Sequence, residues 1–537
     1  MADFFPAAQP QKRAVRFFNT TGPCNPWDHY MLPPEERLVG AQLHRYIRDN
    51  LYWVLHAPRQ TGKTTFLQSW MRQINSGRFT GANALACYVS VERCQEIPEA
   101  EKCMPDLCKA IQDHAVLAGL PVPEITTAVP NSMLSGILMN WAKLTAPKPL
   151  IVLFDEVDVL QGQSLISFLR QLRGGFAERG IGKFPVSIAL VGMRDLKDYI
   201  TMAKEGVPVN PGSPFNIKSD SAVIGNFKEN DIMKLFAQRT EETGQKITDG
   251  ALAYVCGQSQ GQPWIVNSLF QRATMRVLDE NSNETVTVEH IREARRQMTE
   301  GRETHLDSLA VRLRDKNIRR IIETIITGEN DFIVDRSNPD VELAMDLGLI
   351  KWNSESGWTV SNPMYEEIFT RFFNSVYHDN LPPPSNWKWQ KSDGHLDMDG
   401  ILRGFAGFWR KNSEVWEEKS DYTEAFPHLL LQAFLQRILN GGGSVERESA
   451  AGRGRVDLCV EYKGESFILE IKLIHSYDTP DAVRNEGMEQ IIKYRDRINS
   501  GIPAYLLIFD RRPETKKKSW DERLSWAEED GITVLGL

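Results

Sequence analysis

The sequence predicts a multidomain α/β protein, with a parallel β-sheet in its N-terminal half and a second, smaller α/β domain at its C-terminal end. Short all-apolar segments alternate with helical stretches between residues 46 and 212, which is typical of a parallel sheet covered on both faces. A segment at 376–396 contains three consecutive prolines among polar residues and resists helix and sheet formation. A compact α/β pattern then runs over 421–537. Two separate folded parts are therefore expected.

Composition narrows the class of protein. The 537 residues are 41% hydrophobic and 25% charged, and this length is enough for about three to five domains. The formal net charge of -8 provides no chain-wide basic field, so any contact with nucleic acid must come from local basic surface. Seven cysteines without a C-x-x-C pair argue against a zinc site or a disulfide framework. No signal peptide and no membrane span are recognisable, so we expect a cytoplasmic protein that does not contact membranes.

The predicted N-terminal sheet rests on four apolar segments, each of a length that suits a buried strand. They lie at residues 51–55, 84–89, 149–154 and 186–191.

A phosphate-binding loop follows the first of these strands and opens a helix. Residues 57–64 match G-x-x-x-x-G-K-[ST], except that Ala57 replaces the first glycine. Such a loop turns its N–H groups inward around phosphates, Lys63 reaches the β- and γ-phosphates, and the Thr64 hydroxyl binds Mg²⁺. The residues expected to contact ATP here are Ala57, Pro58, Arg59, Gln60, Thr61, Gly62, Lys63, Thr64 and Thr65.

An acidic pair ends the third predicted strand. Asp155 and Glu156 follow four to five apolar residues and should emerge beside the phosphate-binding loop. Asp155 is expected to hold the Mg²⁺ of ATP, directly or through water, and Glu156 to polarise the attacking water. The fourth strand ends in Arg194 and Asp195, and Arg194 can sense the γ-phosphate or form only a surface ion pair.

This order of motifs resembles the STAND and AAA-like ATPases. The resemblance implies a helical lid, in which Pro263 of Gly261-Gln262-Pro263 lies by the nucleotide, and a winged helix with its two strands near residues 349–360. It also implies a nucleotide-driven switch and a homo-oligomer. An arginine on the helix after Glu156 is either an arginine finger for a neighbouring subunit or part of a solvated basic face. The candidates are Arg170, Arg173 and Arg179.

A second chemical site is predicted near the C-terminus. Asp457 begins one strand, and Glu470 and Lys472 lie at the end of the next, where they share one face because side chains alternate along a strand. A hairpin between the two strands brings Asp457 and Glu470 together, where two carboxylates can bind Mg²⁺ or Mn²⁺. Such an ion activates water and neutralises charge at a phosphodiester. Lys472 can orient or deprotonate that water, or stabilise the charged phosphorane.

This C-terminal pattern resembles the PD-(D/E)xK nuclease superfamily, whose domains have a restriction-endonuclease-like fold. A preceding helix at 429–436, the hairpin, the helical pair Gln490 and Tyr494, and a strand at 504–510 reproduce its α-β-β-β-α-β order. Val456 stands where the family has proline. Glu424, or Glu448 on a strand, is the candidate for an additional metal ligand. The arginines nearby can contact a phosphate backbone or belong to a solvated loop; they are Arg447, Arg453 and Arg455.

The whole chain resembles bacterial proteins that fuse an AAA-like ATPase to such a nuclease. We therefore expect an ATP-regulated, metal-dependent nuclease that cleaves DNA rather than RNA, in prokaryotic defence against phage or plasmids. Two alternatives stay open: a nucleotide-dependent scaffold that binds nucleic acid or a partner protein without cutting, and an ATP-driven DNA translocase. The expected divisions are a lead-in at 1–45, the P-loop ATPase core at 46–212, the helical lid at 213–303, a winged-helix-like domain at 304–378, a linker and helix at 379–420, and the nuclease domain at 421–537.

Overall fold

A computed structural model gives the fold of two compact units, which are considered separately. The first comprises Met1–Gly301 with Leu343–Leu349, and the second Arg302–Glu342 with Ile350–Leu537. The residues that the structure describes are 15–79, 83–193, 218–301, 306, 309, 311–327, 338–354, 357–378, 389–417, 426–439, 443–448, 456–474, 478–498, 501–510 and 512–537.

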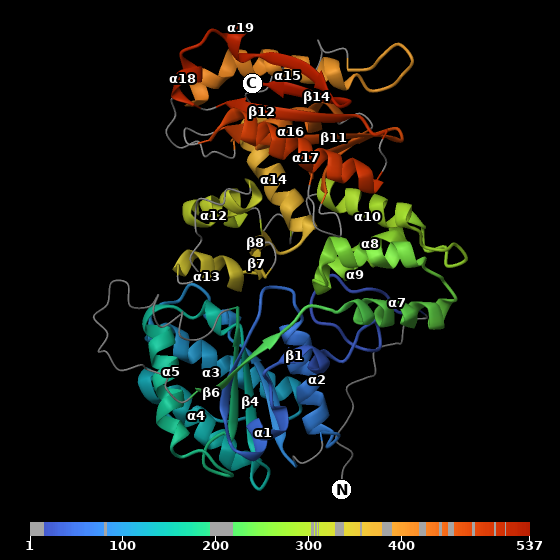
Figure 1. The fold of residues 1–537 in the computed structure, drawn as a ribbon. Coiled ribbons are helices and arrows are strands. Elements are labelled where there is room, and N and C mark those ends of the chain that lie inside the picture. Colours follow the sequence, from blue (N-terminus) through green and yellow to red (C-terminus); the bar gives the residue numbers. More distant parts are fainter. Residues whose placement is uncertain are drawn as a thin grey trace. The chain divides into compact units, whose positions relative to one another are not determined.

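The first unit is built on a six-stranded sheet with the order β1-β6-β2-β5-β4-β3 (Figure 1). All its neighbouring strands are parallel except β1, which runs antiparallel to β6. The predicted parallel sheet is therefore confirmed, with β6 as an addition that its polar sequence concealed. The strands are β1 (Leu38–Val39), β2 (Tyr52–His56), β3 (Leu85–Ser90), β4 (Leu150–Asp155), β5 (Ser187–Gly192) and β6 (Lys218–Ile224).

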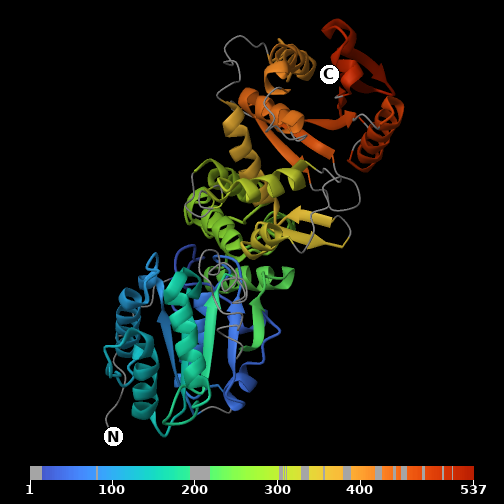
Figure 2. The same ribbon diagram turned by 90° about the vertical axis from the view of Figure 1, so that its left-hand side faces the viewer.

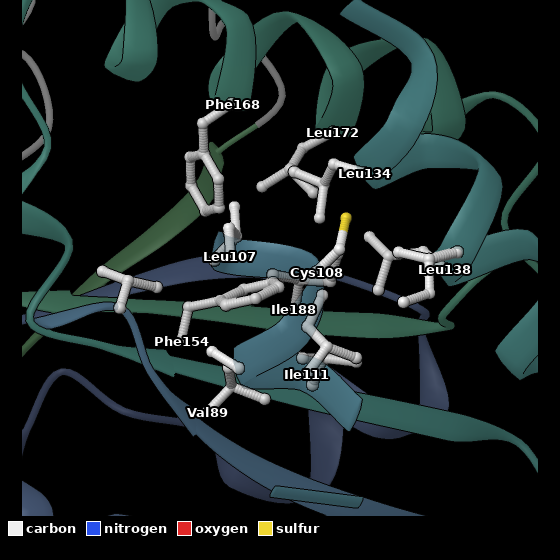
Figure 3. Close-up of a cluster of buried hydrophobic side chains, with 14 of the residues drawn as sticks. Val89, Leu107, Cys108, Ile111, Leu134, Leu138, Phe154, Phe168, Leu172 and Ile188 are labelled. Carbon is white, nitrogen blue, oxygen red and sulfur yellow. The ribbon is translucent and has the colours of Figure 1, made fainter. Parts of the chain in front are cut away.

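Helices cover both faces of this sheet, and each face has its own apolar core. On one face, Phe154 and Ile188 of the sheet meet Leu107, Leu134 and Phe168 of the helices (Figure 3). Because helices cover both faces of the sheet, every residue of β4 and β5 is buried. The helices on this face are α3 (Ala100–Leu117), α4 (Pro130–Thr145) and α5 (Gly162–Phe176), and those on the other are α1 (Leu43–Arg48) and α2 (Lys63–Asn75).

A mostly helical segment completes the first unit. Gly244 ends its first helix in a left-handed conformation, with φ of 78°, and the Thr248 hydroxyl caps the next by accepting a bond from the Ala251 N–H. The segment consists of α7 (Glu229–Thr243), α8 (Asp249–Ser259), α9 (Pro263–Arg272), a π-helical turn (Ala273–Val277) and α10 (Val288–Glu300).

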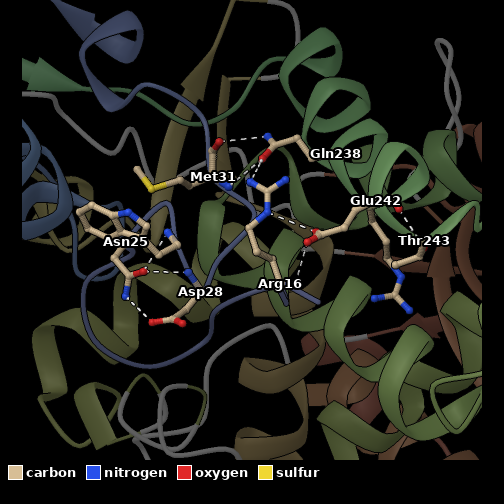
Figure 4. A network of polar contacts seen from close by, with 9 residues as sticks. Arg16, Asn25, Asp28, Met31, Gln238, Glu242 and Thr243 are labelled. Atoms are coloured by element: carbon tan, nitrogen blue, oxygen red, sulfur yellow. Dashed lines mark hydrogen bonds and ion pairs between the residues drawn. The ribbon is translucent and has the colours of Figure 1, made fainter. Parts of the chain in front are cut away.

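The chain before the sheet packs on this helical segment. Phe18 is buried between the rings of Phe236 and Phe270, at centroid distances of 5.8 and 5.0 Å. Figure 4 shows Arg16 directed at α7, where its Nε lies 3.2 Å from a carboxylate oxygen of Glu242. The Met31 N–H and carbonyl both bond to the Gln238 side chain. These contacts tie the lead-in to the helices as well as to the sheet.

The second unit begins with short helices and a small hairpin. The hairpin strands are antiparallel, and Trp352 and Trp358 pair edge-on across it with centroids 5.2 Å apart. The chain here forms α12 (Lys316–Thr327), the first half of α13 (Pro339–Asp346, whose residues from Leu343 on belong to the first unit), β7 (Ile350–Asn353), β8 (Gly357–Val360), α14 (Pro363–His378) and α15 (Met398–Glu417).

The C-terminal sheet has the order β13-β14-β12-β11-β10-β9. Together with its helices (orange to red in Figure 2) it confirms the predicted second α/β fold. Strands β9, β10 and β11 form antiparallel pairs, β11, β12 and β14 are parallel, and β13 is antiparallel to β14. The elements are α16 (Phe426–Leu439), β9 (Gly443–Glu448), β10 (Val456–Tyr462), β11 (Glu465–Ile474), α17 (Pro480–Ile498), β12 (Ala504–Asp510), α18 (Pro513–Lys516), α19 (Trp520–Arg523), β13 (Ser525–Glu529) and β14 (Ile532–Gly536).

Two helical groups pack against this C-terminal sheet. Ile491 and Tyr494 of α17 join the apolar cluster formed by β11, β12 and β14. Phe434 of α16 contacts Phe405 of α15, whose ring also lies 6.3 Å from that of Phe509 on β12. The order α16, β9, β10, β11, α17, β12 is the one that the sequence predicts. Among the residues that the structure describes, no helix is both long and apolar enough to cross a membrane.

Candidate active sites

The phosphate-binding loop lies between β2 and α2. Gly62 adopts a φ of 95°, which a side chain would strain, and the helix begins at the next residue. The Lys63 ammonium folds back onto the loop, where it donates to the Ala57 carbonyl at 2.7 Å and the Pro58 carbonyl at 2.8 Å. Burial lowers the pKa of Lys63 to about 8, while Asp155 and Asp158 oppose this shift. An anion placed here would strengthen the charged form of the lysine.

The acidic pair meets this loop at the end of β4. The Thr64 hydroxyl donates to Asp155 at 2.6 Å, and Asp155 is almost completely buried. Burial raises the pKa of Asp155, against the opposing effects of Thr64 and Lys63. Glu156 takes a left-handed conformation with φ of 62° and accepts a 2.9 Å hydrogen bond from the Ser90 hydroxyl. Burial likewise raises the pKa of Glu156, and Ser90 opposes the shift.

A cavity of about 610 Å³ joins these groups, a volume within the range of small-ligand sites. Pro263 contributes to its wall from α9. Ala57 and Thr61 are buried in the base of the loop instead. The other predicted loop residues on the cavity wall are Arg59, Gln60, Gly62, Lys63, Thr64 and Thr65. A loop that ends at a helix N-terminus, a lysine, and a hydroxyl beside a buried carboxylate form a set of groups that suits a nucleotide with Mg²⁺.

The sequence also predicts a γ-phosphate sensor and three candidate arginine fingers near ATP. Arg194 lies outside the described residues. Arg170 and Arg173 are exposed on α5. Arg179 bonds within its own subunit, to the carbonyls of Asn50 and Phe176 at 2.8 Å each.

Two contributors to this site have no motif that would reveal them. Arg37 donates to the Thr61 carbonyl of the phosphate-binding loop at 2.9 Å, and Ser90 positions Glu156. Both come from segments distant in sequence from the loop. Only the position of Ser90, directly after the apolar segment at 84–89, could have indicated a location beside Asp155.

The second site lies on the β10–β11 hairpin. Leu458 pairs with Leu469, so the antiparallel register places Asp457 opposite Glu470. One oxygen of Asp457 accepts a 2.7 Å hydrogen bond from the Ile471 N–H, which fixes this carboxylate across the hairpin. Glu470 and Lys472 lie within β11, rather than at its end as the sequence analysis expected, because the strand continues to Ile474.

Glu470 is a buried carboxylate with an unusual environment. Its side chain is 3% exposed, and its Oε2 has no hydrogen-bond partner among the described residues. The pKa of Glu470 is raised to about 8, mainly because the carboxyl is buried and secondly because Asp457 carries a like charge nearby. A divalent cation would relieve both causes, so the two carboxylates fit a metal ion. Among the described residues no cluster of three or more His, Cys, Asp or Glu side chains exists to hold a metal.

Lys472 lies between two carboxylates. Its ammonium is 3.5 Å from Glu470 and 3.0 Å from Glu486 of α17. Burial alone would lower the pKa of Lys472, but Glu470 and Glu486 outweigh it and raise the pKa. Gln490 donates to the same Glu486 oxygen at 3.3 Å, which connects it to the lysine. Glu486 is a site residue that the sequence analysis missed.

Tyr494, one turn further along α17, is buried in the core of this domain, and its hydroxyl has no hydrogen-bond partner among the described residues. The remaining nuclease candidates cannot be placed. Glu424, Arg453 and Arg455 fall outside the described residues, and only the backbone of Arg447 and Glu448 is described, in β9.

Comparison with known proteins identifies the C-terminal domain. The family model of the PD-(D/E)XK nuclease superfamily matches residues 422–501. Among solved structures, the Walker-type ATPase PABY2304 of Pyrococcus abyssi aligns with 66% of this chain and 99% of its own, at 12% identity and a TM-score of 0.46. The RuvB Holliday junction branch migration motor of Thermotoga maritima aligns with 59% of this chain and 86% of its own, at 12% identity and a TM-score of 0.31. Both scores are low, so neither likeness bears on function. No curated protein matches the sequence.

Proposed function

We propose that this chain, which joins a P-loop ATPase-type fold to a PD-(D/E)XK superfamily domain, is an ATP-regulated, metal-dependent nuclease that cleaves DNA. The observation that carries the nuclease part is the buried Glu470 carboxylate, with an unpartnered oxygen opposite Asp457 and a lysine beside it. The ATPase part is supported by the cavity that gathers Lys63, Thr64 and Glu156.

At the nuclease site, each protein group has one task. Asp457 and Glu470 hold the ion, which supplies an activated water and positive charge at the scissile phosphate. Lys472 stabilises the negative charge that develops on the phosphate, a task for which its two carboxylate neighbours keep it protonated. Gln490 holds Glu486 and so helps to fix the lysine.

At the ATP site, Lys63 leaves the loop carbonyls to bind the β- and γ-phosphates. Thr64 and Asp155 hold Mg²⁺, and Glu156 orients the attacking water once Ser90 releases it. Pro263 lines the cavity from the helical segment, so nucleotide and helices can influence each other. In this proposal α7–α10 form the lid and residues 304–378 a winged helix.

The biological setting is also part of the proposal. ATP binding orders the lid and promotes a homo-oligomer, which places the nuclease domains on DNA in the cytoplasm. Architectures of this kind suggest prokaryotic defence against phage or plasmids, an inference by analogy. The nuclease domain supports binding of nucleic acid, and the choice of DNA over RNA belongs to the proposal.

The direct test incubates the protein with plasmid DNA, with ATP, and with Mg²⁺ or Mn²⁺. We expect nicked or linear products that require the metal and disappear in Glu470→Gln. The matched control is Glu489→Gln, because Glu489 is exposed on α17 and pairs with Lys493. Equal products from wild type and Glu470→Gln would remove the nuclease proposal.

The same reactions separate the alternatives. A scaffold would bind DNA without any cleavage in either metal. A translocase would hydrolyse ATP at a rate that rises with the length of the DNA, whereas the proposed switch responds to DNA without this dependence on length.

A further inference from the structure

Arg37 lies between the phosphate-binding loop and the start of the helical segment. Its Nη1 donates to the Thr61 carbonyl at 2.9 Å and to the Gly225 carbonyl at 3.0 Å. Its guanidinium also lies over the Phe227 ring, 4.8 Å from the centroid. Phe227 in turn donates from its N–H to the Gly261 carbonyl, two residues before Pro263. The Arg37 side chain therefore connects the loop with the start of the helical segment and, through Phe227, with the turn between α8 and α9.

The charge of Arg37 has no counter-charge in contact with it. Within the described part of the chain, no carboxylate lies within ion-pair distance of its guanidinium, and its Nε is buried without a hydrogen-bond partner. Burial lowers the pKa of Arg37 to about 10, and Asp231 opposes this only in part. A partly buried cation without a counter-charge is costly, which favours an anion that arrives as a ligand.

The position of the free donors indicates which anion. Arg37 lines the same cavity as Lys63. Its Nη2 faces Gly62, where a Cβ atom would lie only 2.8 Å away, so the guanidinium sits against the loop glycine that opens α2. Helix N-termini and guanidinium groups both favour phosphate oxygens.

We infer that Arg37 is a phosphate-binding residue of the nucleotide site. Its Nε and Nη2 edge takes a phosphate oxygen of the nucleotide, while Nη1 keeps the carbonyls of Thr61 and Gly225. The occupied site then holds the lead-in, the loop and the β6–α7 junction together. This inference rests on the proposed binding of ATP, but it assigns the contact to a residue outside the loop motif.

A purely structural role for Arg37 makes a different prediction. If its only task were to support the Thr61 carbonyl, its loss would weaken every ligand of the cavity alike. A phosphate contact weakens ATP and ADP but spares adenosine, which has no phosphate. The ratio of affinities therefore separates the two roles.

The test measures binding of ATP, ADP and adenosine to the full chain by calorimetry, for wild type, Arg37→Met and Arg37→Lys. We expect Arg37→Met to weaken ATP about 10- to 100-fold, the usual worth of a hydrogen bond to a charged group, and adenosine less than about twofold. Arg37→Lys keeps the charge and should lose less. Arg45→Met is the control, because Arg45 lies exposed on α1 and pairs with Asp49.

Thermal unfolding without ligand checks that each variant is folded, and Arg37→Lys carries the test if Arg37→Met is not. Equal losses for ATP and adenosine, or no loss for either, would overturn the inference while leaving ATP binding intact. A wild-type protein that binds no nucleotide would remove the ATP proposal and this inference with it.

Discussion

The two candidate sites differ in how their buried charges are satisfied before any ligand arrives. In the ATP site, Lys63 bonds to two loop carbonyls and Asp155 accepts from the Thr64 hydroxyl. In the nuclease site, Glu470 is as deeply buried as Asp155, yet one of its oxygens has no partner among the described residues.

This difference has a physical consequence for each site. A buried carboxylate that accepts a hydrogen bond retains much of the stabilisation that water would give, whereas an unpartnered one is strongly destabilised in its charged form. The Lys63 and Asp155 side chains of the ATP site should therefore be stable without ligand and change by exchanging hydrogen-bond partners, whereas Arg37 beside them still lacks a counter-charge. The nuclease site should depend on a cation to ionise Glu470 fully.

The largest expected effect is on cleavage in Glu470→Gln. Loss of a metal ligand and of the charge that holds Lys472 should reduce the rate of DNA cleavage by about 10³-fold or more. Because the buried charge is also removed, the metal-free variant should unfold at the same temperature as wild type or higher. Gel assays with calorimetric unfolding measure both. A large loss of stability would show that Glu470 is instead needed for the fold.

The corresponding change in the ATP site is Glu156→Gln. Removal of a general base typically lowers a rate by about 10²- to 10⁴-fold, and we expect ATP hydrolysis to fall within this range while ATP binding remains. Phosphate release and calorimetric titration give the two quantities. Glu99→Gln is the control, since Glu99 is exposed and pairs with Lys102. If Glu156→Gln hydrolyses ATP at the wild-type rate, Glu156 does not orient the attacking water.

The raised pKa of Glu470, about 8, predicts that metal binding at the nuclease site depends on pH. Metal binding must release the proton of this carboxyl, so the affinity for Mn²⁺ should rise by up to about tenfold per pH unit below pH 8 and level off above it. Titration calorimetry in buffers of different ionisation enthalpy reports the released proton. A constant affinity between pH 6 and 8 would contradict the environment described for Glu470.

The same pKa also affects stability without metal. Since the folded-state pKa of Glu470 is raised above its ordinary 4.5, its contribution to stability is fully present below about pH 4.5 and is lost as the pH rises through about 8. The wild-type melting temperature should therefore fall across this window more than that of Glu470→Gln.

The smallest expected effect is that of Glu486→Gln. Glu486 is 63% exposed, and its ion pair with Lys472 is expected to contribute only about 0–1 kcal/mol. The rate of cleavage should fall about two- to fivefold, and the change should disappear in a Lys472→Met background because the two residues act together. Equal effects in both backgrounds would show that Glu486 acts independently of Lys472.

The parts that sequence reasoning could predict are those encoded locally. The apolar runs of β2 and β4, the loop that ends at Thr64, and the alternation of Glu470 and Lys472 each depend on neighbouring residues. The secondary structure of these segments follows from the periodicity of their apolar residues. The pairing of Asp457 with Glu470 follows from the register of the hairpin.

What the sequence did not reveal depends on contacts between distant segments. Arg37 reaches Gly225 across 188 positions, and Ser90 reaches Glu156 across 66. No periodicity marks such pairs. The polar strand β6 is likewise held by its neighbours β1 and β2, not by an apolar sequence of its own.

The central claim is that ATP bound at the first site controls cutting at the second. The most direct measurement compares DNA cleavage with and without ATP in wild type and in Lys63→Met, in the presence of Mn²⁺. The account predicts that ATP changes the rate of wild type and leaves Lys63→Met at its basal, metal-dependent rate, since only the phosphate-binding lysine is lost. An identical response to ATP in both proteins, or none in either, would contradict it.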